Sequence, residues 1–281
     1  MPQPFKFNDR LSGKVALVTG AGSIGKGYGT GKAIAFNFAA EGAKVCLVDR
    51  DAGAAEEARS IIDAAGGDAI VCEGDITIEP DCARMVAATV ERYGKLDILV
   101  NNVGISIGGG RLESLDMSVW DRVLDINLRG AVLLTKHAAP HLIGAGNSAI
   151  VNIASIAGLL ASGAAAYGPS KAALISLTRE LALLYGRSGV RANVICPGHI
   201  QTPHVEGLID EKMRDWRRRI GPLGVEGDAW DVAAAAVFLA SDESRFITAV
   251  CLPVDGGATG VLPMSGHGLI QGWYDETDPR P

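Results

Sequence analysis

Short apolar runs alternate with longer helical patterns along nearly the whole chain. The strand-like runs are residues 14–19, 44–49, 69–73, 96–101, 148–154, 190–196 and 249–254. Helical patterns occupy residues 32–41, 52–65, 79–93, 116–141 (broken near Asp125), 161–185 and 228–240. Strands that alternate with helices form a parallel sheet with helices packed on both faces. The pattern therefore predicts an α/β fold with a doubly wound sheet of about seven parallel strands.

No linker or compositional break divides the chain, and its 281 residues suit one large domain. We therefore expect a single domain over residues 1–281, with its core at 11–257. An irregular segment at 201–226 is expected to form a lid that includes a helix. Residues 258–281 are a C-terminal extension that carries several large apolar side chains. We expect this extension to pack over the substrate pocket, because large apolar side chains are costly to leave in water.

Composition and charge exclude several classes of protein. The net charge of −6 makes nucleic acid an unfavourable partner. No apolar run reaches the roughly 18 residues that a membrane span needs, and residues 1–10 lack the apolar core of a signal peptide. The five cysteines are scattered and odd in number, as expected in a reducing compartment. These features predict a cytoplasmic protein that binds neither nucleic acid nor membrane.

One pair of histidines has a spacing seen in zinc sites. His137 and His141 are four positions apart, but no glutamate follows His137, and Pro140 lies between them. A solvated helix face explains this pair better than a metal site does. We expect the protein to need no metal.

The first apolar run leads into a glycine-rich stretch, residues 20–31 (GAGSIGKGYGTG). Glycines allow a tight turn and a close approach to a pyrophosphate, and the N-terminus of the following helix favours phosphate. Asp49 ends the second apolar run, where a carboxylate can accept hydrogen bonds from an adenosine ribose and repel a 2′-phosphate. The sequence thus predicts a dinucleotide site that prefers NAD to NADP, although Arg50 follows immediately.

The same stretch partly matches the P-loop of nucleoside triphosphatases. Gly20, Gly25 and Lys26 have the P-loop spacing, and residues 45–49 imitate the strand whose aspartate holds magnesium. A P-loop requires serine or threonine after the lysine, however, and Gly27 occupies that position. The P-loop interpretation is therefore disfavoured.

Tyr167 and Lys171 lie four positions apart within a helical pattern, so their side chains share a face. A tyrosine normally has a pKa of about 10, and a nearby ammonium favours the phenolate and lowers that pKa. We expect Lys171 to tune Tyr167 as a group that exchanges a proton near neutral pH. The motif is short, and by itself it also describes an ordinary amphipathic helix.

Several motifs in a fixed order together resemble the short-chain dehydrogenase/reductase family over residues 11–257. They are Thr19-Gly20 with Gly29-x-Gly31, Asp75, Asn101-Asn102-Val103-Gly104, Asn127, Ser155 after residues 150–154 (IVNIA), Tyr167-x-x-x-Lys171, Pro197-Gly198 with Thr202, and residues 253–257 (PVDGG). The resemblance implies a compact Rossmann-type domain that transfers hydride between NAD and a secondary alcohol or ketone.

The resemblance also implies roles for individual residues. Ser155 would bind the substrate oxygen, Tyr167 would move the proton, Lys171 would hold the nicotinamide ribose, and Asn127 would anchor a water. Cofactor contacts are expected from Gly20, Ser23, Gly25, Gly29, Gly31, Asp49, Asp75, Ile76, Asn102, Gly104, Tyr167, Lys171, Pro197, Gly198, Ile200 and Thr202. Family members commonly form tetramers, so a homotetramer is expected.

Three features depart from the family pattern. The glycine-rich loop is five residues longer than usual, which leaves open which glycines touch phosphate. Val103 replaces an alanine, and the tail beyond Gly257 is longer than the family minimum. The role of this tail is not defined by the resemblance.

The substrate itself is only weakly indicated. Apolar residues are expected around the reacting carbon, namely Ile105, Ile107, Ile156, Leu159, Leu160 and Ile200. The arginines at 214, 217, 218 and 219 indicate either a solvated helix face or contact with an acidic substrate or carrier group. A 3-oxoacyl-carrier (ACP or CoA) reductase is therefore the alternative within the family, although Asp49 disfavours it. An enoyl reductase usually has a longer Tyr-to-Lys spacing, and the complete set of catalytic residues argues against a catalytically silent nucleotide sensor.

Overall fold

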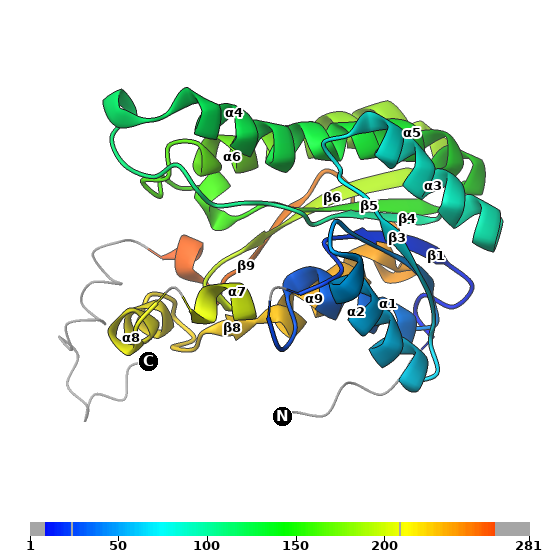
Figure 1. The fold of residues 1–281 in the computed structure, drawn as a ribbon, viewed down its shortest axis with the longest axis horizontal. Coiled ribbons are helices and arrows are strands. Elements are labelled where there is room, and N and C mark those ends of the chain that lie inside the picture. Colours follow the sequence, from blue (N-terminus) through cyan, green and yellow to red (C-terminus); the bar gives the residue numbers. More distant parts are fainter. Residues whose placement is uncertain (1–8, 24, 208, 262–281) are drawn as a thin grey trace.

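A computed structural model describes residues 9–23, 25–207 and 209–261 of the chain. Its centre is a seven-stranded sheet with the strand order β3-β2-β1-β4-β5-β6-β9 (Figure 1). All neighbouring strands in this sheet are parallel. The strands are β1 (Val15–Thr19), β2 (Lys44–Asp49), β3 (Asp68–Glu73), β4 (Ile98–Asn101), β5 (Ser148–Ile153), β6 (Val190–Pro197) and β9 (Cys251–Val254). The predicted doubly wound α/β fold is confirmed.

Helices cover both faces of the sheet, as Figure 1 shows. One face carries α1 (Thr30–Ala40), α2 (Ala52–Ala64) and α9 (Ala229–Ala240). The other face carries α3 (Glu79–Tyr93), α4 (Met117–Leu124), α5 (Gly130–Ala145) and α6 (Tyr167–Tyr185). Every residue of β1, β4 and β5 is buried, because a parallel strand between two helical layers has no solvent face.

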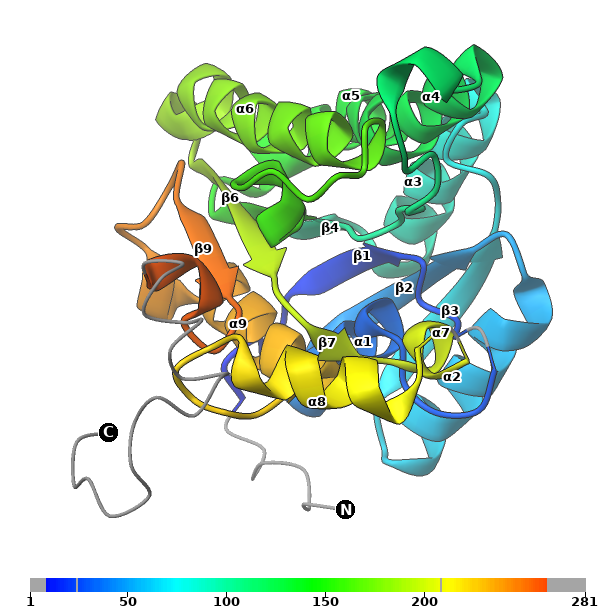
Figure 2. The same ribbon diagram turned by 90° about the vertical axis from the view of Figure 1, so that its left-hand side faces the viewer.

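The order of the strands places the site. The chain leaves β1 toward the α1 face and leaves β4 toward the opposite face, so the crossover direction reverses between these neighbours. In open α/β sheets, ligands bind at such a switch point, beyond the carboxyl ends of the strands. The loops at this edge face the viewer in Figure 2.

The helix predicted at 116–141 is divided into α4, a π-helical turn at Asp125–Arg129, and α5. The predicted break near Asp125 is therefore present. A π-helical turn inserts one extra residue into a helix and is frequent at functional sites. Here it brings the side chain of Asn127 into the protein interior, where only 1% of the residue is exposed.

The helix predicted at 161–185 begins later than expected. The residues before Tyr167 form turns and extended backbone, and Gly163 has a positive φ of 75°. The predicted start was wrong because small, apolar residues continue the helical pattern of α6 into a segment whose backbone is not helical. Tyr167 is consequently the first residue of α6 rather than an interior one.

The segment predicted as a lid is built from short elements on the α9 side of the sheet (Figures 1 and 2). It contains β7 (Ile200–Gln201), α7 (Pro203–Glu206), α8 (Glu211–Arg219) and β8 (Gly227–Asp228). Strands β7 and β8 pair in parallel as a separate ribbon, which the sequence did not predict. The ribbon attaches both ends of the lid to the start of α9.

After β9 the described chain continues through a short 3-10 turn, Ala258–Gly260. The extension predicted to cover the substrate pocket falls mostly on residues 262–281, which lie outside the described residues. Within the described part of the chain, no helix has the length and apolar character required to cross a membrane.

Candidate active site

Lys171 is the most enclosed charged group in the site. Its residue is 3% exposed, and its Nζ donates a hydrogen bond of 2.9 Å to the carbonyl oxygen of Ile153 at the end of β5. A Cβ placed on Gly104 would lie 2.8 Å from the same Nζ, so a side chain there would displace the ammonium group. Burial lowers the pKa of Lys171 from 10.5 to about 8.

Tyr167 lies one helical turn before Lys171, and the Lys171 Nζ is 5.7 Å from the centre of its ring. The two side chains share a face of α6, as their spacing predicted. The pKa of Tyr167 is nevertheless raised, chiefly by burial, and a hydrogen bond with the Ser155 side chain offsets only part of this shift. The expected net lowering by Lys171 is therefore wrong for the protein alone, where desolvation outweighs the charge of the lysine.

Ser155 follows β5, and its Oγ accepts a hydrogen bond of 3.1 Å from the backbone N–H of Ala157. This bond fixes the hydroxyl at the carboxyl edge of the sheet, within hydrogen-bonding reach of the Tyr167 phenol. Ser155 and Tyr167 thus present two hydroxyl groups side by side. Such a pair can hold one substrate oxygen and exchange a proton with it.

Asn127 connects this pair to the loop after β4. Its Oδ1 accepts a bond of 2.8 Å from the Ile105 N–H, and its Nδ2 donates to the Ile105 carbonyl at 2.9 Å. Nδ2 also donates to the Ser170 Oγ at 3.0 Å. The side chain of Asn127 is therefore occupied by protein partners, and the expected role in anchoring a water remains a prediction.

Ser170 was not singled out from the sequence. Its fully buried hydroxyl accepts the bond from Asn127 and donates one of 2.7 Å to the carbonyl oxygen of Tyr167. It therefore joins the π-helical turn to the first residue of α6. Its position immediately before Lys171 was the available signal, but a serine in a helix has no distinctive partner in the sequence alone.

The glycine-rich loop turns sharply at its start and packs closely at its end. Gly20 has a φ of 63°, and a Cβ on Gly31 would lie 2.0 Å from the Gly20 carbonyl oxygen. The Asn102 Nδ2 donates to the Thr19 carbonyl at 2.9 Å and thereby ties this loop to the one after β4. Glycine is required at both positions because no side chain fits there.

The loop presents polar groups that suit a phosphate. Within the described residues, the buried Oγ of Ser23 has no hydrogen-bond partner. Gly29 precedes the first turn of α1, where free backbone N–H groups and the helix dipole attract anions. Ser23, Gly29 and Gly31 are thus positioned as predicted for the pyrophosphate of a dinucleotide, whereas Gly25 lies farther out, in the exposed middle of the loop.

Asp49 ends β2 beside this loop. Its Oδ2 accepts a hydrogen bond of 2.9 Å from the Gly22 N–H, and its Oδ1 accepts one of 3.1 Å from the Asp51 N–H. Each carboxylate oxygen can still accept a further bond, because an ionised carboxylate has about four lone-pair sites. The carboxylate is thereby fixed where a ribose would lie.

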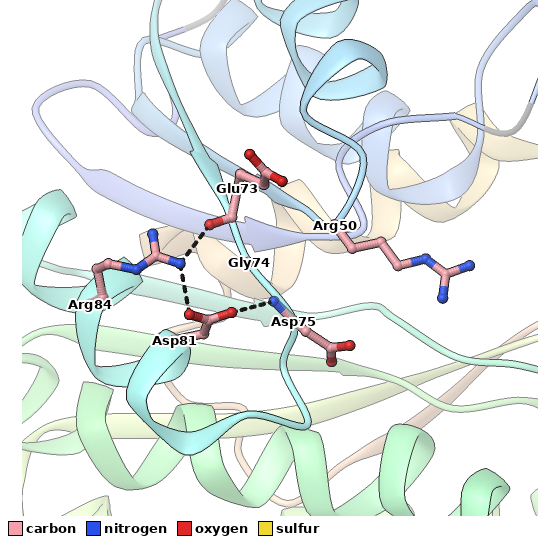
Figure 3. Close-up of a pocket in the computed structure, with 6 residues that line it drawn as sticks. All are labelled: Arg50, Glu73, Gly74, Asp75, Asp81 and Arg84. Carbon is pink, nitrogen blue, oxygen red and sulfur yellow. Dashed lines mark hydrogen bonds and ion pairs between the residues drawn. The ribbon is translucent and has the colours of Figure 1, made fainter.

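A cavity of about 400 Å³ lies at the carboxyl ends of β2 and β3 (Figure 3). It is lined by Arg50, Glu73, Gly74, Asp75, Asp81 and Arg84. The Arg84 Nη2 donates to the Glu73 carbonyl and to Asp81, and Asp81 accepts from the Asp75 N–H at 2.9 Å. The cavity is separate from the Ser155–Tyr167 pair and corresponds to the adenosine end of a dinucleotide in this fold. In Figure 3 the Arg50 guanidinium extends away from Arg84.

Other predicted cofactor residues lie on the same edge of the sheet. Pro197 ends β6, and a Cβ on Gly198 would lie 2.5 Å from Asp255 Cβ, so the turn after β6 contacts the segment after β9. The side chains of Ile76 and Ile200 are buried in the core, which leaves backbone contacts for these two residues. Thr202 is half-buried immediately before α7.

The arginine cluster on α8 is neutralised within the lid. Arg214 and Arg217 pair with Glu226, with the Arg217 Nε 2.9 Å from Glu226 Oε1. Arg218 pairs with Glu211, and Arg219 pairs with Asp215. The Arg217 Nη2 also donates to the Ile200 carbonyl at 3.0 Å, so this arginine attaches α8 to β7. The cluster serves to build the lid, which the sequence interpretation did not anticipate.

Cysteine and histidine side chains in the described residues do not form a metal site. All five cysteines are free thiols. The Sγ atoms of Cys196 and Cys251, on adjacent strands β6 and β9, are 3.2 Å apart. His137 lies 3.3 Å from a carboxylate oxygen of Glu79, consistent with the predicted solvated helix face.

Comparisons with known proteins agree with this geometry. A family model described as Enoyl-(Acyl carrier protein) reductase matches residues 24–259. A 2,5-dichloro-2,5-cyclohexadiene-1,4-diol dehydrogenase from Sphingobium indicum is 39% identical over 250 residues, which is 89% of this chain and 97% of the relative. A cis-4-hydroxycyclohexanecarboxylate dehydrogenase from Sinomonas cyclohexanicum is 39% identical over 91% of this chain and 100% of its own. The solved structure of a 7α-hydroxysteroid dehydrogenase with NADH and 7-oxo glycochenodeoxycholic acid has a TM-score of 0.83 at 33% identity, covering 91% of this chain and 98% of that one.

Proposed function

Because the chain belongs to the short-chain dehydrogenase/reductase family, we propose that it is an NAD(H)-dependent oxidoreductase that interconverts a secondary alcohol and a ketone. The observation that carries this proposal is the Ser155–Tyr167 hydroxyl pair beside the buried ammonium of Lys171. An oxidoreductase of this family is supported directly by the relatives; the cofactor, the mechanism and the substrate class are our inference.

In alcohol oxidation, the substrate hydroxyl lies between the Ser155 Oγ and the Tyr167 phenol. Tyr167 accepts the hydroxyl proton, and Ser155 donates a hydrogen bond that stabilises the oxygen as negative charge develops. The nicotinamide supplies the acceptor for the hydride that leaves the carbinol carbon. Lys171 holds positive charge near the phenol, and in ketone reduction Tyr167 returns the proton to the oxygen.

The residues present fit a dinucleotide. The unpaired Ser23 hydroxyl and the N-terminus of α1 suit a pyrophosphate, and the cavity at Asp75 suits an adenine. Asp49 would accept hydrogen bonds from the ribose 2′- and 3′-hydroxyls and repel a 2′-phosphate. The cofactor proposed for this protein is therefore NAD.

Cyclic secondary alcohols are the first substrate class to test. Two relatives are named for oxidation of substituted cyclohexane or cyclohexadiene alcohols, and a structural neighbour is named for a steroid alcohol. An acidic carrier group is less favoured, because each arginine of the α8 cluster already has a carboxylate partner. A 3-oxoacyl-carrier reductase thus loses the sequence feature that suggested it.

The test is a panel of cyclic and open-chain secondary alcohols and ketones, followed through the nicotinamide absorbance at matched NAD and NADP concentrations. Turnover of at least one secondary alcohol with NAD supports the proposal. Turnover of 3-oxoacyl thioesters alone would replace it with the carrier-linked reductase. Binding of NADH without turnover of any alcohol or ketone would indicate a nucleotide-sensing protein.

A further inference from the structure

The middle of the glycine-rich loop is the feature that the proposed catalysis leaves unexplained. Residues Gly25–Tyr28, here called the strap, belong to a loop five residues longer than the family pattern. Gly25 and Gly27 have positive φ angles of 81° and 118°, and residues 25–27 are exposed. An exposed loop of this composition is expected to be mobile unless its ends are attached.

One end of the strap is attached by an aromatic cluster. The Tyr28 ring lies 4.6 Å from that of Trp230 in α9 and 6.2 Å from that of Phe36 in α1, measured between ring centres. The Nζ of Lys32 lies 5.3 Å from the Tyr28 ring centre and pairs with Glu57 of α2 at 2.7 Å. Only 3% of Lys32 is exposed, so this attachment is well enclosed. Aromatic and cation–π contacts of this kind hold Tyr28 against the α1 and α9 face.

The other side of the strap contacts the lid. A Cβ placed on Gly27 would lie 3.2 Å from Pro203 Cγ, and one on Gly25 would lie 3.9 Å from Pro203 Cβ. Pro203 is the first residue of α7 and directly follows Thr202. Figures 1 and 2 both show α7 beside the loop that joins β1 to α1. The strap thus connects the loop after β1 with the segment after β6.

These two contacts place the strap at the outer side of the phosphate-binding turn. The inner side holds the unpaired Ser23 hydroxyl and the N-terminus of α1. A pyrophosphate bound there would have the strap on one side and the carboxyl edge of the sheet on the other. Trp230 follows β8, which pairs with β7 immediately before Pro203, so the strap and the lid share one base.

We propose that the strap and Pro203 form a clasp over the dinucleotide, so that cofactor release requires the lid to separate from the glycine-rich loop. This inference rests on the dinucleotide binding proposed above. It assigns Tyr28 and Pro203 as positioning residues for the cofactor. Opening of a lid or loop commonly limits release in enzymes of this size.

The experiment measures the dissociation rate of NADH from the full chain by stopped-flow fluorescence. Pro203→Ala removes the ring that contacts Gly27, and Tyr28→Ala removes the aromatic attachment. Each variant has a matched control: Pro222→Ala alters a lid proline that packs against Gly257, where a Cβ would lie 3.0 Å from it, and Tyr28→Phe keeps the ring. Melting temperatures of all variants show whether the fold is retained, and Tyr28→Leu replaces Tyr28→Ala if the latter does not fold.

We expect Pro203→Ala and Tyr28→Ala to release NADH at least about tenfold faster than wild type, because weakening an interaction that holds the bound state together acts mainly on the dissociation rate. Pro222→Ala and Tyr28→Phe should stay within about twofold of wild type. If the wild type binds NADH and the two clasp variants release it at the wild-type rate, the strap is only a packing element and the clasp is disproved. A wild type that binds no NADH would overturn the proposed function, and the clasp with it.

Discussion

The Nζ of Lys171 lies 5.7 Å from the centre of the Tyr167 ring, and burial shifts the pKa of both side chains toward the uncharged form. The pKa of Tyr167 is raised, and that of Lys171 falls to about 8. The protein alone therefore holds this pair in a state poised against ionisation. Proton exchange at Tyr167 depends on charge that substrate and cofactor bring to the site.

The lowered pKa of Lys171 predicts a specific dependence of stability on pH. Between the folded pKa of about 8 and the ordinary value of 10.5, the unfolded chain binds a proton that the folded chain does not. The contribution of Lys171 to the free energy of unfolding should therefore rise with pH through this window, by up to about 1 kcal/mol per pH unit, and stay at its lowest value below about pH 8. Urea unfolding of wild type and Lys171→Met at pH 7.5, 8.5 and 9.5 measures it. A constant difference between the two proteins would contradict the burial of a titrating Lys171.

Asp49 should set the choice of cofactor. We expect wild type to favour NAD over NADP by at least about tenfold in kcat/KM, since loss of a ribose hydrogen bond together with charge repulsion exceeds about 1.4 kcal/mol. Asp49→Ser should reduce that preference. Asp51→Ser is the matched control, because Asp51 caps α2 by accepting the Ala54 N–H at 3.1 Å. Equal efficiencies of the wild type with both cofactors would refute the role of Asp49.

The ion pair between Arg217 and Glu226 should hold the lid in place. The two side chains are only 11% and 6% exposed, and loss of one buried partner leaves the other charge uncompensated. Glu226→Gln should lower the melting temperature by roughly 3 °C or more and raise the KM for substrate. Glu211→Gln serves as the control, because that carboxylate is 74% exposed. A similar small effect of both substitutions would show that the pair does not organise the lid.

Assembly into a tetramer remains a prediction from family resemblance. Helices α5 and α6 expose apolar side chains, including Val132 and Ile143 at 42% and 39% and Leu183 and Leu184 at 77% and 64%. Replacing Leu183 and Leu184 together by aspartate should dissociate the assembly, because charged side chains are unfavourable in an apolar interface. Sedimentation at micromolar concentration measures this, with Leu112→Asp as an exposed control. A wild-type monomer would contradict the expectation.

The pattern of apolar runs was sufficient to predict the sheet and most helices. β2 and α3 begin and end where the pattern predicted, because a buried parallel strand and an amphipathic helix each leave a clear local period. The shared face of Tyr167 and Lys171 also followed from their spacing. These features depend on residues close together in the sequence.

Features that depend on distant contacts were not predictable. The pKa of Lys171 depends on its burial beside Ile153 and Gly104, which come from two other strand ends. Ser170 gains its bridging role only through the π-helical turn that presents Asn127. The contact between Gly27 and Pro203 joins opposite halves of the chain, and short strands such as β7 carry too few residues for a detectable period.

The central claim is that the Tyr167 hydroxyl transfers the proton during hydride exchange. Its most direct test is the single-turnover rate of alcohol oxidation for wild type and Tyr167→Phe, with NADH affinity measured separately by fluorescence titration. General acid–base catalysis contributes at least about 100-fold, so we expect the variant to be slowed by that factor or more while its Kd for NADH stays within about threefold. A single-turnover rate near that of wild type, with NADH bound normally, would contradict the account.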